Sequence, residues 1–220
     1  IMALNKLKFN SINVTPAASE AIRFNSGANG LETTSSFGGS LKKLSTTTLS
    51  SAASAISFTS GIDSTYKEYI FIANNIHAET NGQNFRVDFK DSSGNSLTKT
   101  TSFFMAYNNE AGSSDYSLEY DTSIDQAQST SGAAISQFGF GGETADECGT
   151  FIVHLFEPSS TTFTKHFLAT SRGMGYDSDQ YTVTGYTGGY VNSTTAVTQA
   201  SFAFNSGNID AGTITMYGVS

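Results

Sequence analysis

Apolar and polar residues alternate along short stretches of the chain from residue 45 onward, and turn-forming clusters separate these stretches. In the clearest example, residues 85–90, three apolar residues alternate with three charged ones. Successive side chains of a strand point to opposite faces, so this alternation predicts a half-buried strand. No stretch repeats apolar residues at the spacing of an amphipathic helix. The pattern therefore predicts an all-β chain with little helix.

Further stretches fit strands by the same pattern, and their spacing leaves no room for helical crossovers, so we expect antiparallel pairing. They are residues 55–59, 68–74, 102–107, 116–120, 134–140, 149–156, 163–170, 180–186, 196–204 and 212–217. So many antiparallel strands in one region are typical of a jelly-roll sandwich. We predict an antiparallel jelly-roll-like β-sandwich over residues 45–220, with residues 149–156 as a central strand buried on both faces and Phe and Tyr side chains as core filler.

The first 44 residues have a different pattern. Their large apolar side chains are dispersed among Asn, Ser, Thr and Gly, in two short alternating pieces at residues 7–14 and 21–25 that cannot close a core. A glycine pair at residues 38–39 and the hydroxyl-rich run 45–51 separate this segment from the sandwich. We predict an extended N-terminal arm, residues 1–44, that docks onto a neighbour through Leu7, Phe9, Ile12, Val14, Ile22, Phe24 and Leu31; a loose terminus is the alternative.

Charge and cysteine content narrow the classes of partner. Lys and Arg number 11 against 19 Asp and Glu, and the net charge is −8, which disfavours binding to a phosphate backbone. No apolar run approaches the roughly 20 residues of a membrane-spanning helix. The single cysteine, Cys148, cannot form an internal disulfide or a structural zinc site alone. We expect no nucleic acid, no membrane and no cofactor as partners.

Residues with possible chemistry are present but scattered. The three histidines, His77, His154 and His166, lie in separate segments, and we expect His154 to be a hydrogen-bonded core histidine. Residues 91–95 and 177–179 carry oxygen ligands that calcium could use, yet ordinary turn chemistry fits them better. Four acidic residues on one polar stretch are the candidates for paired catalytic carboxylates, although nothing in the sequence makes two converge: Asp115, Glu119, Asp121 and Asp125. We therefore expect no enzymatic activity.

Several segments are specific when taken together. They are MALNKLKFNS at residues 2–11, VTP at 14–16, STYKEY at 64–69, NIH at 75–77, FEPSSTTFTKHF at 156–167 and FNSGNIDAGTITMYGV at 204–219. The chain resembles virion structural proteins of marine tailed bacteriophages through these segments, which span nearly its whole length. In that family a terminal strand with an aromatic or leucine, then Tyr-Gly and an aliphatic residue, closes a jelly-roll-like module. Met216-Tyr217-Gly218-Val219 fills that role, with Met216 in the place of the aromatic residue or leucine.

The resemblance implies a non-enzymatic protein on the outer surface of the virion. We expect a capsid decoration or cement protein, a homotrimer whose arm binds sister subunits or the major capsid protein. The alternative is a tail fibre or appendage module that binds host surface glycans. For that alternative, the stacking platforms would be Tyr176, Tyr181, Tyr186 and Tyr190.

Overall fold

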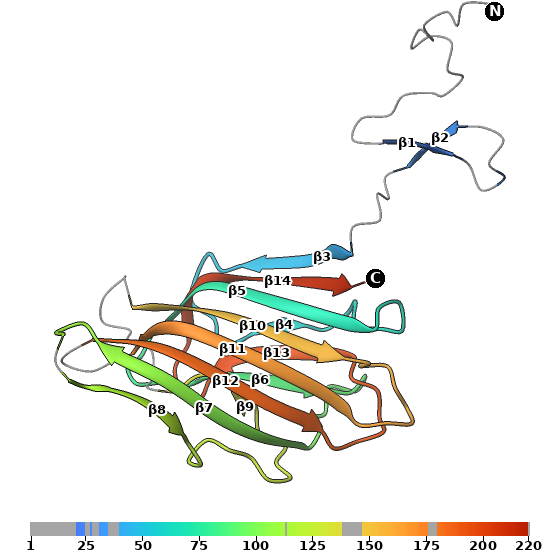
Figure 1. Ribbon diagram of the computed structural model, residues 1–220. Helices are drawn as coiled ribbons and strands as arrows, with labels where there is room; N and C mark the ends of the chain where they lie inside the picture. The colour runs from blue at the N-terminus through green and yellow to red at the C-terminus, as the bar shows by residue number, and fades with distance from the viewer. Residues whose placement is uncertain are drawn as a thin grey trace, which may run out of the picture. The chain divides into compact units, whose positions relative to one another are not determined.

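The computed structural model describes residues 21–24, 27, 31–34, 40–112, 114–137, 147–175 and 180–219. These residues form fourteen strands and, within the described ranges, no helix (Figure 1). The chain divides into two units, residues 1–40 and residues 41–220. The predicted arm ended at residue 44, whereas the third strand already begins at Leu41 and belongs to the second unit.

The first unit contains one hairpin, β1 (Ala21–Phe24) and β2 (Leu31–Thr34). The second unit is built from two antiparallel sheets. The larger sheet has the order β3-β14-β5-β10-β11-β12-β7-β8, and the smaller has the order β4-β13-β6-β9. Their bounds are β3 Leu41–Thr48, β4 Ile56–Phe58, β5 Glu68–Ala78, β6 Phe85–Lys90, β7 Lys99–Asn109, β8 Tyr116–Tyr120, β9 Ala133–Ala134, β10 Cys148–Phe156, β11 Lys165–Gly175, β12 Tyr181–Val191, β13 Gln199–Phe204 and β14 Ile209–Val219.

Eight of these strands reproduce the pairing order of a jelly roll. If β3, β4, β5, β6, β9, β10, β13 and β14 are counted from one to eight, one half has the order 1-8-3-6, as β3-β14-β5-β10. The other half has the order 2-7-4-5, as β4-β13-β6-β9. This is the interleaved arrangement that two Greek keys produce. The predicted antiparallel jelly-roll-like sandwich is therefore confirmed.

The remaining four strands form an extension of the larger sheet. The hairpin β7-β8 is inserted between the fourth and fifth jelly-roll strands, and β11-β12 is inserted between the sixth and seventh. Both insertions add to the free edge of β10, in the order β11-β12-β7-β8. The larger sheet therefore has twice as many strands as the smaller one. The first added strand, β11, still packs against the smaller sheet, since the rings of Phe167 on β11 and Phe89 on β6 lie 5.1 Å apart.

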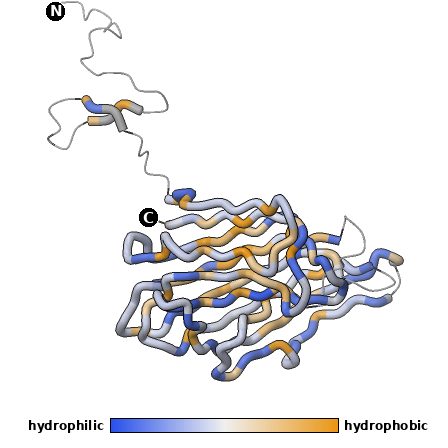
Figure 2. The backbone as a smooth tube through the Cα atoms, turned by 180° about the vertical axis from the view of Figure 1, so that it is seen from behind, coloured by the Kyte–Doolittle hydropathy of each residue, from blue (hydrophilic) through white to orange (hydrophobic). Residues whose placement is uncertain are grey.

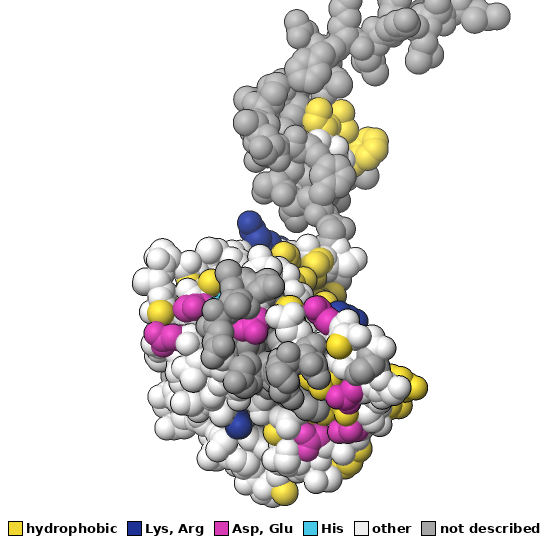
Figure 3. Space-filling model, turned by 90° about the vertical axis from the view of Figure 1, so that its left-hand side faces the viewer, with side chains coloured by type: hydrophobic (Ala, Val, Ile, Leu, Met, Phe, Trp, Pro, Cys, Tyr) yellow, Lys and Arg dark blue, Asp and Glu magenta, His cyan; other side chains and the backbone are white. Residues whose placement is uncertain are grey.

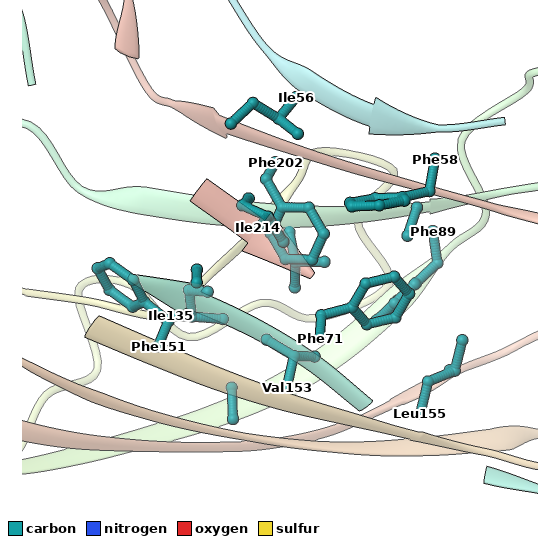
Figure 4. Packing of buried hydrophobic residues seen from close by; sticks show 14 of the residues in the cluster. Ile56, Phe58, Phe71, Phe89, Ile135, Phe151, Val153, Leu155, Phe202 and Ile214 are labelled. Carbon is teal, nitrogen blue, oxygen red and sulfur yellow. The ribbon is translucent and has the colours of Figure 1, made fainter. Parts of the chain in front are cut away.

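The main core lies between the two sheets and is rich in phenylalanine, as predicted (Figure 4). Phe85 of β6 lies 4.6 Å from Phe151 of β10, measured between ring centroids, and Phe202 of β13 lies 5.3 Å from Phe71 of β5. Along β6, β10 and β13, buried positions alternate with more exposed ones. Figure 2 shows hydrophobic and hydrophilic residues interspersed along the backbone of the sandwich. A smaller cluster of Phe103, Met105, Tyr181 and Val183 fills the inner side of the extension.

The prediction that the strand at residues 149–156 is buried on both faces was wrong. The strand is central, as expected, and Phe151, Val153 and Leu155 are buried against the smaller sheet. Its other face, with Ile152 and His154, is only half-buried. The reason is the two-layer architecture, since among the described residues no third layer covers the outer face of the larger sheet.

Candidate assembly surfaces

The first candidate surface is the apolar face of the β1-β2 hairpin. Phe24 lies opposite Leu31 in the hairpin register, and Ile22 lies two residues before Phe24, so all three side chains share one face. They are 42% (Ile22), 72% (Phe24) and 38% (Leu31) exposed. Figure 3 shows these apolar side chains at the surface of the hairpin. The other predicted arm contacts, Leu7, Phe9, Ile12 and Val14, lie outside the described residues.

A hairpin of this size is not stable by its own interactions. A two-stranded hairpin in water is at best marginal, and it needs a further strand or a packing surface. Burying each large apolar side chain yields about 1.5–3 kcal/mol, which a partner surface would supply here. The three exposed side chains therefore mark a face that is suited to docking.

The second candidate surface is the outer face of the extension. We define it by Phe104 on β7, Tyr186 on β12, Leu168 on β11 and the three alternating β8 residues Tyr116, Leu118 and Tyr120. Phe104 lies opposite both Tyr120 and Tyr186, and the Phe104 and Tyr186 rings stack at 5.0 Å with an interplanar angle of 12°. The β8 side chains are the most open, with exposures of 62–75%. This face is an apolar patch that solvent reaches.

The structure separates the four tyrosines that were predicted as glycan platforms. Tyr186 and Tyr190 are four residues apart on β12 and share its outer face, where Tyr190 contacts the ring of His166. Tyr181 is instead 8% exposed in the smaller core cluster, and its hydroxyl donates to Asp115 Oδ2 at 2.6 Å. Tyr176 lies outside the described residues. The sequence did not single out Phe104 or the β8 residues, because only the strand register brings them beside Tyr186.

A groove of about 780 Å³ lies where the loop before β5 meets the loop between β10 and β11. Hydroxyl side chains and the rings of Tyr66, Phe156 and Phe163 line it. Lys67 Nζ and Glu157 Oε2 form an ion pair of 3.0 Å beside it, but both side chains are more than half exposed, so solvent screens the pair. The groove therefore offers a ligand mainly hydroxyl hydrogen bonds and aromatic contacts.

The three histidines lie on three different strands, β5, β10 and β11, and the lone cysteine, Cys148, lies opposite His77 in the pairing of β10 with β5. His77 Nδ1 lies 2.7 Å from Asp210 Oδ1, and His154 Nδ1 lies 2.5 Å from Glu68 Oε1. Glu68 is the hydrogen-bond partner that we expected for His154. His154 lies at a half-buried position on the outer face of the larger sheet, however, and not in the core. Cys148 is a free, half-buried thiol. Within the described residues no group of three or more His, Cys, Asp or Glu could hold a metal ion.

The four acidic candidates each hold a neighbouring group in place. Asp115 accepts from Tyr181, Glu119 accepts from the Tyr107 hydroxyl at 3.1 Å, and Asp121 accepts from the Ser123 amide. Asp125 accepts from the Phe103 amide and from the Tyr120 hydroxyl, and this hydrogen bond raises the pKa of Tyr120. The carboxylates therefore support the loop and strand geometry around β8.

Two buried lysines stand out among the polar residues of the sandwich. Lys99 Nζ donates to Asp88 Oδ1 at 2.6 Å and to the Leu97 carbonyl, whereas Lys165 Nζ donates to the Ser193 carbonyl at 2.6 Å. Both side chains are fully buried, and burial lowers the pKa of each lysine. Both amines are enclosed and donate hydrogen bonds to groups of the sandwich, so we assign both a structural role.

Comparison with known proteins finds no relative of the chain. No protein-family model matches the chain, and no curated protein and no solved structure matches it. In the described part of the chain, no helix has the length and apolar character needed to cross a membrane. A functional proposal can draw on the fold, the hairpin face, the outer face of the extension and the resemblance of the sequence.

Proposed function

We propose that the chain is a non-enzymatic structural protein of a bacteriophage virion, a capsid decoration or cement protein that binds the outer shell through its N-terminal arm. The observation that carries this proposal is the exposed apolar face of the β1-β2 hairpin, in a unit separate from the sandwich. An arm that buries Ile22, Phe24 and Leu31 on a partner gains the contacts that it lacks alone. The resemblance to phage virion proteins supports the same role.

The fold is compatible with this role, since jelly rolls are common in virus particles and also occur in lectins. A chain with a net charge of −8 stays soluble and resists nonspecific association at a particle surface. Contacts that cross capsomer boundaries stabilise a shell by binding only its assembled form. In this proposal the partners are sister subunits, as a homotrimer, and the major capsid protein.

Electron microscopy of virions labelled with an antibody to the chain tests where it resides. We expect label over the capsid surface. Label on the tail alone would move the protein to the appendage alternative. Virions without label would overturn residence in the particle.

A pair of matched substitutions tests the arm. Phe24 on the hairpin and Phe163 on the sandwich are equally exposed, at 72% and 73%. We expect Phe24→Asp to abolish binding to particles and Phe163→Asp to leave it unchanged, as measured by co-sedimentation with particles stripped of the protein. Equal binding by both variants would remove the hairpin from the attachment site.

A second candidate function is glycan binding by a tail fibre or appendage module. The observation that favours it is the outer face of the extension, where the aromatic residues Phe104, Tyr120 and Tyr186 lie side by side. Aromatic rings can stack on the apolar faces of sugars. A glycan array on which the chain binds, and on which Tyr120→Ala does not bind, would favour this candidate. No binding by the native chain would exclude it.

A further inference from the structure

The larger sheet of the sandwich ends in two open edges, β3 and β8. Within the described residues no strand pairs with the outer side of either. Edge strands present unpaired backbone N–H and C=O groups, to which another strand can add. β3 offers eight residues for pairing and β8 offers five.

The strand directions allow the two edges to pair with each other across copies. Every neighbouring pair in the larger sheet is antiparallel, and the sheet has eight strands. In an even-numbered sheet of this kind the two edge strands run in opposite directions. When a second copy is added in the same orientation, its β3 is therefore antiparallel to β8 of the first copy.

The charges on the two edges are opposite in sign. β3 carries the exposed residues Lys42 and Lys43 and contains no acidic residue. β8 contains Glu119, is flanked by Asp115 and Asp121, and contains no basic residue. Two β3 edges therefore repel each other, as do two β8 edges, whereas β3 and β8 attract. Charged residues at a sheet edge usually prevent pairing, but here they prevent only the pairing of like edges.

The faces of the two strands match as well. Lys42 lies opposite Gly218, and Glu119 lies opposite Met105, so both charges are on the face of the sheet that carries the core. On the other face, β3 presents Leu41, which is 47% exposed, and Lys43, while β8 presents Tyr116, Leu118 and Tyr120. Pairing would place Lys42 near Glu119 on one face and would cover apolar side chains on the other.

We propose that β3 of one copy pairs antiparallel with β8 of a second copy, so that the larger sheet continues from one molecule to the next. The contact joins two different surfaces, so successive copies close into a ring or extend as a chain, depending on the rotation between neighbours. It deepens the self-association in the proposed function and rests on that part of it. Arms bound to one particle would strengthen the contact by raising the local concentration of sandwiches.

Charge reversal at Lys42 and at Glu119 tests this contact in the full chain. We expect the native chain to associate reversibly at low ionic strength in sedimentation velocity, and Lys42→Glu and Glu119→Lys each to weaken association about three- to tenfold. The chain carrying both reversals should recover native association, and an equimolar mixture of the two single variants should associate more strongly than either variant alone. Arg172→Glu is the matched control for Lys42→Glu. It also replaces a positive charge by a negative one at an exposed position, but on β11 in the interior of the sheet.

Three outcomes would overturn the proposal: a native chain that remains monomeric at all concentrations, association that ignores both reversals, or a double variant that fails to recover. Binding of the same variants to particles separates this inference from the proposed function. Particle binding together with charge-insensitive association would contradict only the edge contact. Charge-dependent association without particle binding would contradict only the virion role.

Discussion

Strands β6 and β1 both alternate large apolar residues with polar ones, but the apolar side chains are buried in β6 and exposed in β1. In β6, Phe85, Val87 and Phe89 are fully buried because the larger sheet packs over them. In β1, Ile22 and Phe24 are 42% and 72% exposed, and the only described strand beside them is β2. An amphipathic strand thus identifies a surface to be covered, while the architecture decides whether the chain itself covers it.

The first prediction contrasts one aromatic residue from each region. Phe85→Ala should lower the free energy of unfolding of the sandwich by about 3–5 kcal/mol, because it removes a ring that contacts Phe151, Phe202 and Phe204. Phe24→Ala should leave that free energy unchanged. Urea denaturation of both variants, followed by circular dichroism, measures the difference. A comparable loss from Phe24→Ala would show that the hairpin belongs to the sandwich core.

The second prediction contrasts the covered and open faces of one strand, β12. A Cβ atom at Gly189 would lie 2.7 Å from the Phe167 ring and 2.8 Å from the Thr100 carbonyl, whereas nothing lies within 4 Å of a Cβ atom at Gly188. Gly189→Ala should therefore lower the free energy of unfolding by about 1–3 kcal/mol. Gly188→Ala should be neutral within about 0.5 kcal/mol. Thermal melts of the pair check this, and equal effects would mean that the outer face is covered.

The third prediction compares the two buried lysines. Because burial lowers the pKa of Lys165, its charged form opposes folding below about pH 10, and Lys165→Met should raise the free energy of unfolding by about 1 kcal/mol. Lys99→Met should lower it by about 1–3 kcal/mol, because Asp88 would lose its closest cationic partner. Denaturant titrations at pH 7 measure both. Destabilisation by Lys165→Met would show that the hydrogen bond to Ser193 outweighs desolvation.

The smallest expected effect concerns two exposed turns. Hydrogen bonds from Thr65 lower the pKa of Asp63, and hydrogen bonds from Asn95 lower the pKa of Asp91. A carboxylate with a lowered native pKa stabilises the fold above its unfolded pKa of about 4, and this contribution is lost as the pH falls through its native value. Asp63→Asn combined with Asp91→Asn should flatten the acid limb of the stability curve. If the acid limb of the stability curve is unchanged, other carboxylates cause the loss of stability at low pH.

Much of the sandwich was predictable, because core strands show alternation in their own sequence. The stretches predicted as strands overlap observed strands, although residues 134–140 do so only at Ala134, and residues 138–140 lie outside the described residues. Residues 91–95 form the predicted turn, where the Asp91 carboxylate accepts the amides of Ser93 and Asn95. The missed strand, β3, is an exposed edge in which Lys, Ser and Thr outnumber the two leucines, Leu41 and Leu44. It is held by backbone pairing to β14 and by hydroxyl contacts such as Thr48 to Thr213 at 2.9 Å, which leave no apolar pattern.

The candidate surfaces were less predictable than the fold. The hairpin face could be anticipated from Ile22, Phe24 and Leu31, because those residues cannot form a core in so short a segment. The outer face of the extension could not, since Phe104 and Tyr186 meet only after two insertions pair beside β10. Likewise, the opposite charges of β3 and β8 indicate a contact between copies only when both strands are known to be edges of the sheet.

The central claim is that the sandwich folds alone and that the arm attaches it. The most direct measurement compares the full chain with a chain that begins at Leu41, both for the free energy of unfolding and for co-sedimentation with stripped particles. Removal must stop at Ser40, because Leu44 on β3 packs against the main core. We predict unchanged unfolding and lost particle binding. An unfolded sandwich, or undiminished binding without the arm, would contradict the account.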